Sequence, residues 1–536
     1  MTTGRQRAPG GLLQCGGMSC LGHPGGADAS ARQGRLSRRQ VLARGVGAAG
    51  LLGAASPAPA QTPRPSAPPR PAIPAMPFVI EAGWALTVNG RDELTLVRDA
   101  SIVVERGTIT DVRQGRVAGT QARLDARTLL VLPGFISGHT HVASGTPTRG
   151  LIEGGRSYAR PLEVMEGLDD TSLDALTAIN LAELLRSGCT TQVEMSLSLR
   201  QAESYVRVAT RWGVRGYPAP MIPGVPRLFP IWQRKDDTAL TASVPGTLVE
   251  IAAARRFAER HANANGGLIR PQIAPHATDT HTPETMGAVL DAARAIGNGL
   301  HLHLAQGARE TETVTRLWGA SPVRWLDQLG TYDLPVFGAH MNGVDWAADG
   351  ALLKAKGVVF SHCPSAGGAG GESMPYPEAL GAGVAVNIGI DTHSNDYIEN
   401  LKLAVLYGQA REALLRRTSP VPLERPTIWT AVAGATLVPA RGLRRDDLGR
   451  IRAGARADLT MVDVSGLLVG SGALPPEPLN HLLYANGTSV RHVMTDGRLQ
   501  VFDGRVVCDD EARVVAQGGH VVQQVWRQLD QEGWFR

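Results

Sequence analysis

The chain has 536 residues, enough for a barrel-sized domain of about 250 residues together with a smaller one. Its formal net charge is +5, but residues 1–60 carry seven arginines and a single acid, Asp28. Removing these from the chain's 54 basic and 49 acidic residues leaves 47 and 48, a net charge of −1. This balance removes the electrostatic case for a nucleic-acid-binding protein.

The first 60 residues show the order of features expected of an export signal. The run SRRQVL at residues 37–42 resembles the twin-arginine motif, residues 41–55 are weakly apolar, and APA at residues 58–60 offers a cleavage site. We expect the twin-arginine export machinery to carry the protein to the periplasm or out of the cell. A disordered basic tail is the alternative, and a start at Met18 stays open. Because the apolar stretch contains Arg44 and four glycines, we expect no stable membrane anchor.

Composition divides the rest of the chain into segments. Residues 61–77 are rich in proline and alanine, which predicts an extended linker. Short β-like runs separated by X-Gly turns occupy residues 78–134, and similar runs occupy residues 442–510. We expect these two segments to form one small composite β-sandwich domain, followed by a C-terminal helix or tail over residues 511–536.

Residues 135–441 alternate strand-like with helical runs, which predicts an α/β class and most simply a (β/α)8 TIM-like barrel. The strand-like runs are 190–195, 268–273, 300–304, 336–339, 358–361 and 384–390, and the clearest helical runs are 174–187, 283–296 and 398–416. A doubly wound sheet is the alternative, but no G-x-G-x-x-G loop follows an early strand. The stretches 148–167 and 218–234 are expected to be pocket-lining loops.

His139 and His141 follow an apolar run with one residue between them. Residues i and i+2 of a strand point to the same side, so both imidazoles could face one cation. Two structural histidines near a turn would look the same. His303, His340 and Asp391, however, follow later strand-like runs, whose carboxyl ends converge on one face of a barrel. Together these residues predict a metal site on that face.

The run from Pro133 to His141 resembles the first-strand signature of the amidohydrolase superfamily. The resemblance covers nearly the whole chain after the linker, and it is closest to the branch of triazine hydrolases and cytosine, guanine and S-adenosylhomocysteine deaminases. The matching runs are APH at 274–276, HLH at 301–303, GAH at 338–340, SHCPS at 361–365, GID at 389–391 and the segment 449–459.

The resemblance implies four metal ligands, which are His139, His141, His303 and Asp391. Three neutral imidazoles and one carboxylate suit Zn²⁺ or Fe²⁺ and leave a position for water, whose pKa the metal would lower from 15.7 toward about 7. Many two-metal relatives bridge their ions with a modified mid-barrel lysine. None of the four lysines is in a plausible mid-barrel strand, so one divalent ion is expected; they are Lys235, Lys354, Lys356 and Lys402.

The resemblance also assigns catalytic and substrate-binding roles. His340 would act with Asp391 in activating the water, and His276, Gln306 and Arg149 would bind substrate. Gln306 departs from the pattern, because deaminase relatives usually carry a proton-shuttling glutamate three residues after the fifth-strand histidine. An amide is neither a general acid nor a general base. Proton transfer would therefore fall to His340, Asp391 or another group, or the substrate would need less of it.

Four other polar residues are weighed against ordinary structural roles. His281 could approach substrate from a loop, but we expect a solvated loop residue. His362 is expected to be structural. His393 could line the pocket or pair with Asp391, and a structural role is at least as well supported. Glu194 could border the pocket or support it from behind.

We therefore expect a metal-dependent hydrolase that attacks a C–N bond, or a related C–X bond, of a small cyclic nitrogenous substrate, in the manner of a deaminase or amidohydrolase. Hydrolysis of an acyclic amide, urea or N-acyl compound is the alternative. This reaction would tolerate the absence of the glutamate better. A catalytically silent exported binding protein is disfavoured by the retained ligand set. Substrate identity and homo-oligomerisation stay open.

Overall fold

The structure is a computed structural model, and it describes residues 78–119, 122–151, 153–156, 159–225 and 238–535. The expected export signal and linker lie outside these residues, as does most of the stretch 218–234. Within the described part of the chain, no helix is both long and apolar enough to cross a membrane.

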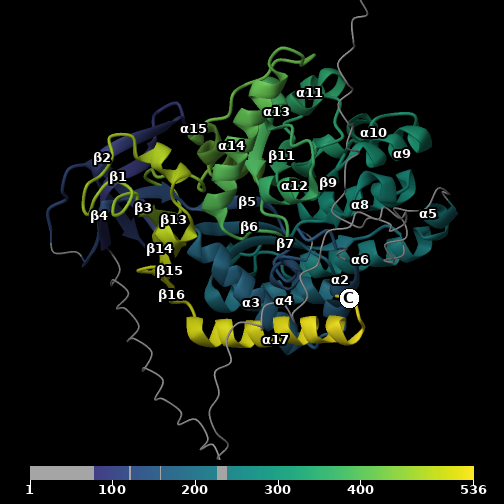
Figure 1. Cartoon of the computed structure of the whole chain (residues 1–536), viewed down its shortest axis with the longest axis horizontal. Helices are drawn as coiled ribbons and strands as arrows, with labels where there is room; N and C mark the ends of the chain where they lie inside the picture. Colours follow the sequence, from purple (N-terminus) through teal and green to yellow (C-terminus); the bar gives the residue numbers. More distant parts are fainter. Residues whose placement is uncertain (1–77, 120–121, 152, 157–158, 226–237, 536) are drawn as a thin grey trace, which may run out of the picture. The chain divides into compact units, whose positions relative to one another are not determined.

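Strands within residues 78–133 and 459–506 form one mixed sheet of eight strands (Figure 1). From edge to edge the order is β16 (Arg505–Val506), β15 (Arg498–Phe502), β14 (Val490–Thr495), β13 (Leu459–Val462), β4 (Ala122–Pro133), β1 (Phe78–Val88), β2 (Leu94–Glu105) and β3 (Thr108–Gln114). The two segments join where β13 runs antiparallel to β4, with Leu459 opposite Pro133. The expected composite β domain is therefore confirmed, as one continuous hydrogen-bonded sheet.

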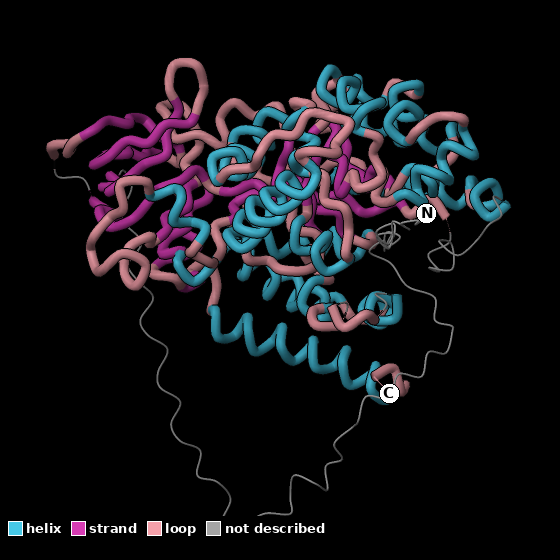
Figure 2. Tube along the Cα trace, turned by 45° about the horizontal axis from the view of Figure 1, so that its top comes forward, coloured by secondary structure: helices cyan, strands magenta, loops and turns pink. Residues whose placement is uncertain are grey.

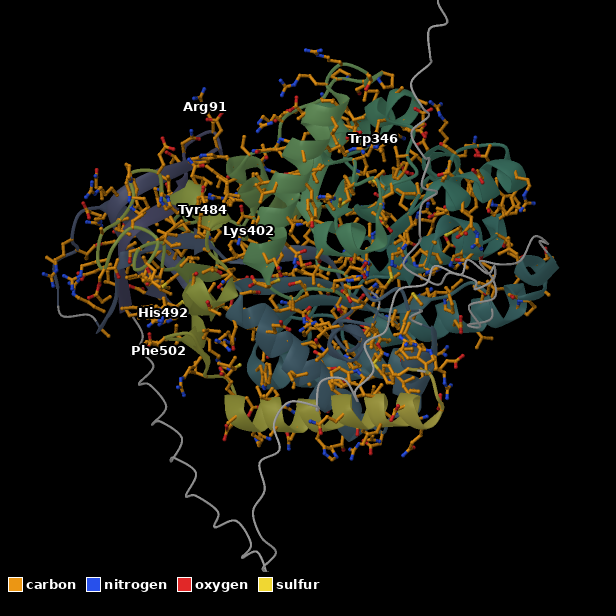
Figure 3. The ribbon with its side chains drawn as sticks, in the orientation of Figure 1. Arg91, Trp346, Lys402, Tyr484, His492 and Phe502 are labelled. Atoms are coloured by element: carbon orange, nitrogen blue, oxygen red, sulfur yellow. The ribbon has the colours of Figure 1, made fainter. Side chains whose placement is uncertain are left out.

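This sheet curls around its own apolar core. Ile109 of the edge strand β3 donates its N–H to the carbonyl of Ala455, just before β13, at 2.8 Å. The buried core on the inner face includes Ile80, Ile102, Val131, Met461 and Met494. Toward the other edge, His492 on β14 and Phe502 on β15 lie side by side, with ring centroids 4.8 Å apart (Figure 3).

Eight parallel strands follow the order of the chain around a barrel. They are β5 (Phe135–Thr140), β6 (Cys189–Ser196), β7 (Arg215–Ile222), β8 (Ala274–Pro275), β9 (Leu300–Leu304), β10 (Val336–His340), β11 (Val359–His362) and β12 (Ala385–Ile388). Bridges from Ala277 to His303 and from Thr140 to Asp391 join the two four-stranded halves. The (β/α)8 barrel expected from the alternating runs is confirmed.

Helices cover the outside of the barrel (Figure 2). The principal ones are α3 (Asp170–Arg186), α4 (Leu199–Trp212), α6 (Val244–Arg260), α8 (Pro283–Ile296), α9 (Ala308–Trp318), α10 (Pro322–Gln328), α11 (Trp346–Ala355), α13 (Tyr376–Gly381), α14 (Tyr397–Leu415), α15 (Ile428–Ala435) and α16 (Leu437–Gly442). The sequence of β9, LHLHL, shows how the two sides are divided. Its three leucines belong to the large apolar core shared with the helices, whereas His301 and His303 alternate with them and point inward.

Strand β7 is the barrel strand that the sequence patterns did not predict. It contains Pro218 and Pro220, which cannot donate to a ladder and normally signal a turn. The expectation of a loop beginning at residue 218 is therefore wrong as far as Ile222. The run at 268–273 does lie along β7, with Gln272 donating to the carbonyl of Pro218 at 3.1 Å, but the regular part of β8 comes later and is short.

The C-terminal helix α17 (Glu511–Gln531) packs against α2 (Ala159–Glu166) and α3 through an apolar stripe that includes Val521, Val525 and Leu529. Trp526 donates its indole N–H to the carbonyl of Pro147, just after β5, at 2.8 Å. Arg156 donates to the carbonyls of Trp534 and Phe535 and lies over both rings. The last residues of the chain therefore support the segment that leaves β5.

A buried ion pair ties the barrel to the sheet domain, and we expect its loss to be costly. Arg215 at the start of β7 and Asp458 beside β13 are 2% and 4% exposed, with Arg215 Nε 2.7 Å from Asp458 Oδ2. Arg215→Met leaves the carboxylate buried without its cation, so the free energy of unfolding should fall by about 3–5 kcal/mol. Thermal unfolding measures the loss. Arg207→Met, at a more exposed pair with Asp174, should cost about 1 kcal/mol or less; equal losses would contradict this ranking.

Candidate active site

Four barrel strands deliver a cluster of buried metal-ligating side chains. His139 lies in β5 and His141 directly after it, His303 lies in β9, His340 at the end of β10 and Asp391 just after β12. Each is at most 5% exposed. Because all four strands are parallel, their carboxyl ends meet at the same mouth of the barrel, as the sequence pattern predicted.

Distances within the cluster fit the coordination of a single ion. The ligating atoms of His139, His303 and His340 lie within 4.8 Å of one another, and so do those of His139, His141 and Asp391. His141 Nε2 is 3.5 Å from Asp391 Oδ1. Two ligands on one tetrahedral zinc, each at 2.0–2.2 Å, are about 3.4 Å apart. The two groups share His139 and make one compact site.

The histidines present lone pairs rather than protons to this site. His141 Nδ1 lies 2.6 Å from the carbonyl of Met195 and His303 Nδ1 lies 2.8 Å from that of His276, so in both rings Nδ1 is the donor and Nε2 the free acceptor. Burial lowers the pKa of His139 and His303 well below the ordinary value, which keeps both imidazoles neutral. The Nε2 atom of His139 is buried with no hydrogen-bond partner among the described residues. These side chains fit Zn²⁺ or Fe²⁺.

Two of the site residues have a strained backbone. His340 and Asp391 have φ values of 76° and 62°, a conformation that costs non-glycine residues about 1–3 kcal/mol. Neighbouring strands hold Asp391 there, because its N–H donates to the carbonyl of His139 at 3.1 Å and its own carbonyl accepts from His141 N–H at 3.2 Å. The strain turns both side chains toward the site.

Glu194 supports the first-strand ligands from behind. It is fully buried at the end of β6 and accepts hydrogen bonds from the Thr140 hydroxyl at 2.7 Å, the Val142 N–H at 3.0 Å and the Ser196 hydroxyl at 2.8 Å. Burial raises the pKa of this carboxyl to about 7. Because it accepts hydrogen bonds from the residues on both sides of His141, Glu194 fixes the direction in which that imidazole points.

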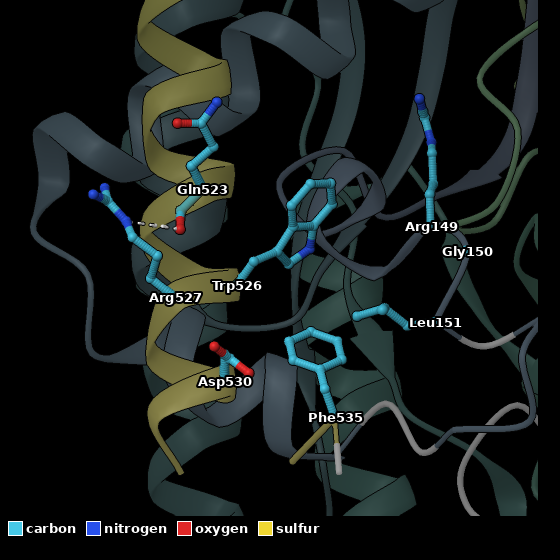
Figure 4. A pocket seen from close by; sticks show the side chains of 8 residues that line it. All are labelled: Arg149, Gly150, Leu151, Gln523, Trp526, Arg527, Asp530 and Phe535. Carbon is cyan, nitrogen blue, oxygen red and sulfur yellow. Dashed lines mark hydrogen bonds between the residues drawn. The ribbon is translucent and has the colours of Figure 1, made fainter. Parts of the chain in front are cut away.

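The three expected substrate-binding residues lie in different places. The ring of His276 is beside that of His303, with centroids 5.0 Å apart, and Gln306 is 8% exposed in the loop after β9. Arg149 lies outside the metal cluster: its Nε donates to the His393 carbonyl at 2.9 Å and it pairs with Glu183. It also lines a cavity between the segment after β5 and α17, whose other lining residues are Gly150, Leu151, Gln523, Trp526, Arg527, Asp530 and Phe535 (Figure 4).

His281 and His362 lie outside the metal cluster and have structural partners. The expectation of a solvated His281 is wrong: it is fully buried, and its nitrogens lie 3.2 Å from the Thr285 hydroxyl and the Ile222 carbonyl. The proline-interrupted β7 that supplies this carbonyl was itself not foreseen. His362 stacks on Tyr376 at 5.0 Å.

Sequence reasoning assigned no role to two residues near the site, Glu153 and His301. Glu153 Oε1 accepts a hydrogen bond from His393 Nδ1 at 2.8 Å, and this contact lowers the pKa of Glu153 to about 2. His301 lies below His303 inside the barrel, with Nδ1 2.8 Å from Gln272 Oε1. Its i−2 spacing from His303 was the available signal.

The lysines of the described residues are all away from the barrel strands. Lys354 and Lys356 lie at the end of α11, and Lys402 lies on α14 (Figure 3). Lys235 lies outside the described residues. No lysine in the described chain is therefore placed to bridge two ions inside the barrel.

Residues 130–500, more than half of the chain, match the sequence pattern of the amidohydrolase family. The chain belongs to the amidohydrolase family. This amidohydrolase is 30% identical to a 5-methylthioadenosine/S-adenosylhomocysteine deaminase of Moorella thermoacetica, over 75% of this chain and 89% of the relative. It is 26% identical to a 5'-deoxyadenosine deaminase of Methanosarcina mazei, over 80% and 94% of the two chains.

Solved structures show the same fold. An adenosine deaminase of Xanthomonas campestris with bound zinc matches with a TM-score of 0.69 and 23% identity, over 84% of this chain and 99% of that one. An atrazine chlorohydrolase of Arthrobacter aurescens complexed with zinc matches with a TM-score of 0.68 and 20% identity, over 83% and 100%. The family match and the similarity to relatives named as deaminases show that this amidohydrolase is a metal-dependent hydrolase of non-peptide C–N bonds, as its sequence predicted.

Removing one imidazole should empty the metal site. We expect His303→Ala to lower bound zinc from about one ion per chain to nearly none, because an incomplete ligand set binds zinc weakly. Elemental analysis of the purified protein measures the ratio. His281→Ala, which removes another buried histidine outside the cluster, should keep its zinc. Full zinc occupancy in His303→Ala would contradict the assigned ligand set.

Proposed function

We propose that this amidohydrolase removes the exocyclic amino group of an adenine-type nucleoside by hydrolysis. The proposal is carried by one coincidence: a buried site of imidazoles and one carboxylate lies in a chain similar, over most of its length, to relatives named as deaminases of adenine nucleosides. The overall reaction would add water to the ring carbon, break its bond to the amino nitrogen and release ammonia.

The described side chains divide this work. When bound, the divalent cation supplies an acidified water, with a pKa of about 7. His139, His141, His303 and Asp391 would hold the cation. His340 Nε2 lies 3.7 Å from Asp391 Oδ2, which supports a role for this pair in taking the proton released as water attacks and returning it to the departing nitrogen. His276, packed beside His303, would orient the ring.

Gln306 favours a second candidate reaction. Its amide can donate a hydrogen bond to a ring nitrogen but cannot protonate it. A substituent that leaves as a stable anion, such as a halide on an electron-poor ring, departs without that proton. Hydrolytic displacement of such a group is therefore the alternative reaction at the same site.

Ammonia release separates these reactions. We expect turnover of adenosine, 5'-methylthioadenosine or S-adenosylhomocysteine by the zinc-loaded protein, and little on N-acyl amino acids. Gln306→Glu should raise kcat/KM for the ring amines by about 100-fold, the lower range for a positioned general acid. Gln306→Asn, which keeps an amide, should give no gain. Release of halide but not ammonia would favour the displacement reaction, and a failure of both the native protein and the Gln306→Glu variant to turn over ring amines would refute deamination.

We further propose that the protein is exported through the twin-arginine pathway, as the SRRQVL run suggests. Fusing residues 1–77 to a reporter that is active only after folded export should give activity outside the cytoplasm. Replacing both Arg38 and Arg39 by lysine should abolish it, whereas replacing Arg5 and Arg7 should not. Export that survives the first replacement would refute the assignment.

A further inference from the structure

Glu310 makes a buried bridge between two loops at the mouth of the barrel. It lies in the first turn of α9 and is 6% exposed. Its Oε2 accepts the Gln306 N–H at 2.7 Å, and its Oε1 accepts the Thr278 N–H at 3.1 Å and the Thr278 hydroxyl. One carboxylate thus joins the loop that leaves β8 after His276 to the loop that leaves β9 after His303.

These two loops carry the residues placed to meet substrate. The N–H of His303 donates to the carbonyl of His276 at 3.0 Å, which fixes the two strand ends, but Gln306 lies three residues beyond this bond. Ala305 has a φ of 46°, which turns the chain away from β9 just before Gln306. The direction of the Gln306 side chain therefore depends on how its backbone is held. Glu310 holds that backbone by accepting the Gln306 N–H.

This bridge is more than a local helix cap. In a capping box, the side chain at the third helical position returns to the N–H of the N-cap residue, here Gly307. Glu310 instead reaches past Gly307 to Gln306, and it also binds Thr278 on a different β/α unit. Burial together with the nearby Asp279 carboxylate raises the pKa of Glu310 to about 7. Keeping the carboxylate buried here costs free energy that a local helix cap would not require.

We propose that Glu310 is a positioning residue that sets the spacing and orientation of His276 and Gln306 around the substrate ring. This inference rests on the proposed function for what those two residues bind. Glu310 acts through the backbone of Gln306 and through Thr278. It therefore influences turnover by way of the orientation of other groups, where small displacements are costly.

A double-mutant cycle separates positioning from general support. Glu310→Gln keeps the size of the side chain but has only one acceptor oxygen for the two loops. We expect it to lower kcat/KM by about 10- to 100-fold in the native background. In a Gln306→Ala background the same substitution should cost less than in the native background, because one of the two groups that Glu310 orients is gone and only the effect on His276 remains. Equal losses in both backgrounds would overturn the proposal.

Two control variants distinguish a loss of positioning from a general loss of stability. Glu378→Gln alters a buried carboxylate paired with Arg411 between α13 and α14, away from the mouth, and should leave kcat/KM within about 2-fold. Thr278→Val removes only the hydroxyl bond and should give a smaller loss than Glu310→Gln. A loss at Glu378→Gln as large as that at Glu310→Gln, tracking thermal stability, would overturn the proposal.

Hydrogen exchange makes the test independent of substrate. In the zinc-loaded protein, Glu310→Gln should speed amide exchange in peptides that contain Thr278 and Gln306, with no change in peptides from the sheet domain. Unchanged exchange in both loops would overturn the inference even if the enzyme is a deaminase. If no ring compound is turned over, the proposed function fails, and the exchange pattern alone then decides whether Glu310 orders these loops.

Discussion

The closure of the barrel between its first and last strands is the constraint on which the site depends. The carbonyl of His139 accepts the N–H groups of Ile390 and Asp391, and His141 returns a hydrogen bond to the Asp391 carbonyl. These backbone contacts bring ligands about 250 positions apart in the sequence to within a few ångströms. Because the bonds involve the ligand residues themselves, the barrel cannot close in this register without assembling the β5 and β12 part of the metal site.

Without a cation, burial of this cluster is unfavourable in free energy. Other groups at the mouth of the barrel give its polar atoms hydrogen-bond partners. Several imidazoles and a carboxylate lie where water is largely excluded, and polar groups there need partners. Carbonyls at the ends of neighbouring strands accept hydrogen bonds from the Nδ1–H groups of His141 and His303. Glu194 holds the backbone on both sides of His141. A positive φ at His340 and Asp391 adds strain. Binding of the metal offsets these costs and couples metal uptake to the final fold.

Much of this arrangement could be read from the sequence, because its signals are periodic. The i, i+2 spacing in β5, the alternation in β9 and the placement of Asp391 after an apolar run all follow from strand geometry. The misses have physical causes as well. β7 carries two prolines, which hide a strand, and the burial of His281 depends on that strand. The contacts of Glu153 and Glu310 cross between separate β/α units, and no local pattern reports such contacts. The assigned roles of the site residues stay predictions.

The attachment of α17 has a consequence for the order in which the protein can be completed. In the segment after β5, the Pro147 carbonyl and the Arg156 side chain form hydrogen bonds with residues 526–535, late in the chain. During synthesis the early barrel strands emerge hundreds of residues before the helix that supports them. The segment that leaves β5 therefore reaches its final form only after α17 has been synthesised, and translation products that stop before residue 526 would lack this support.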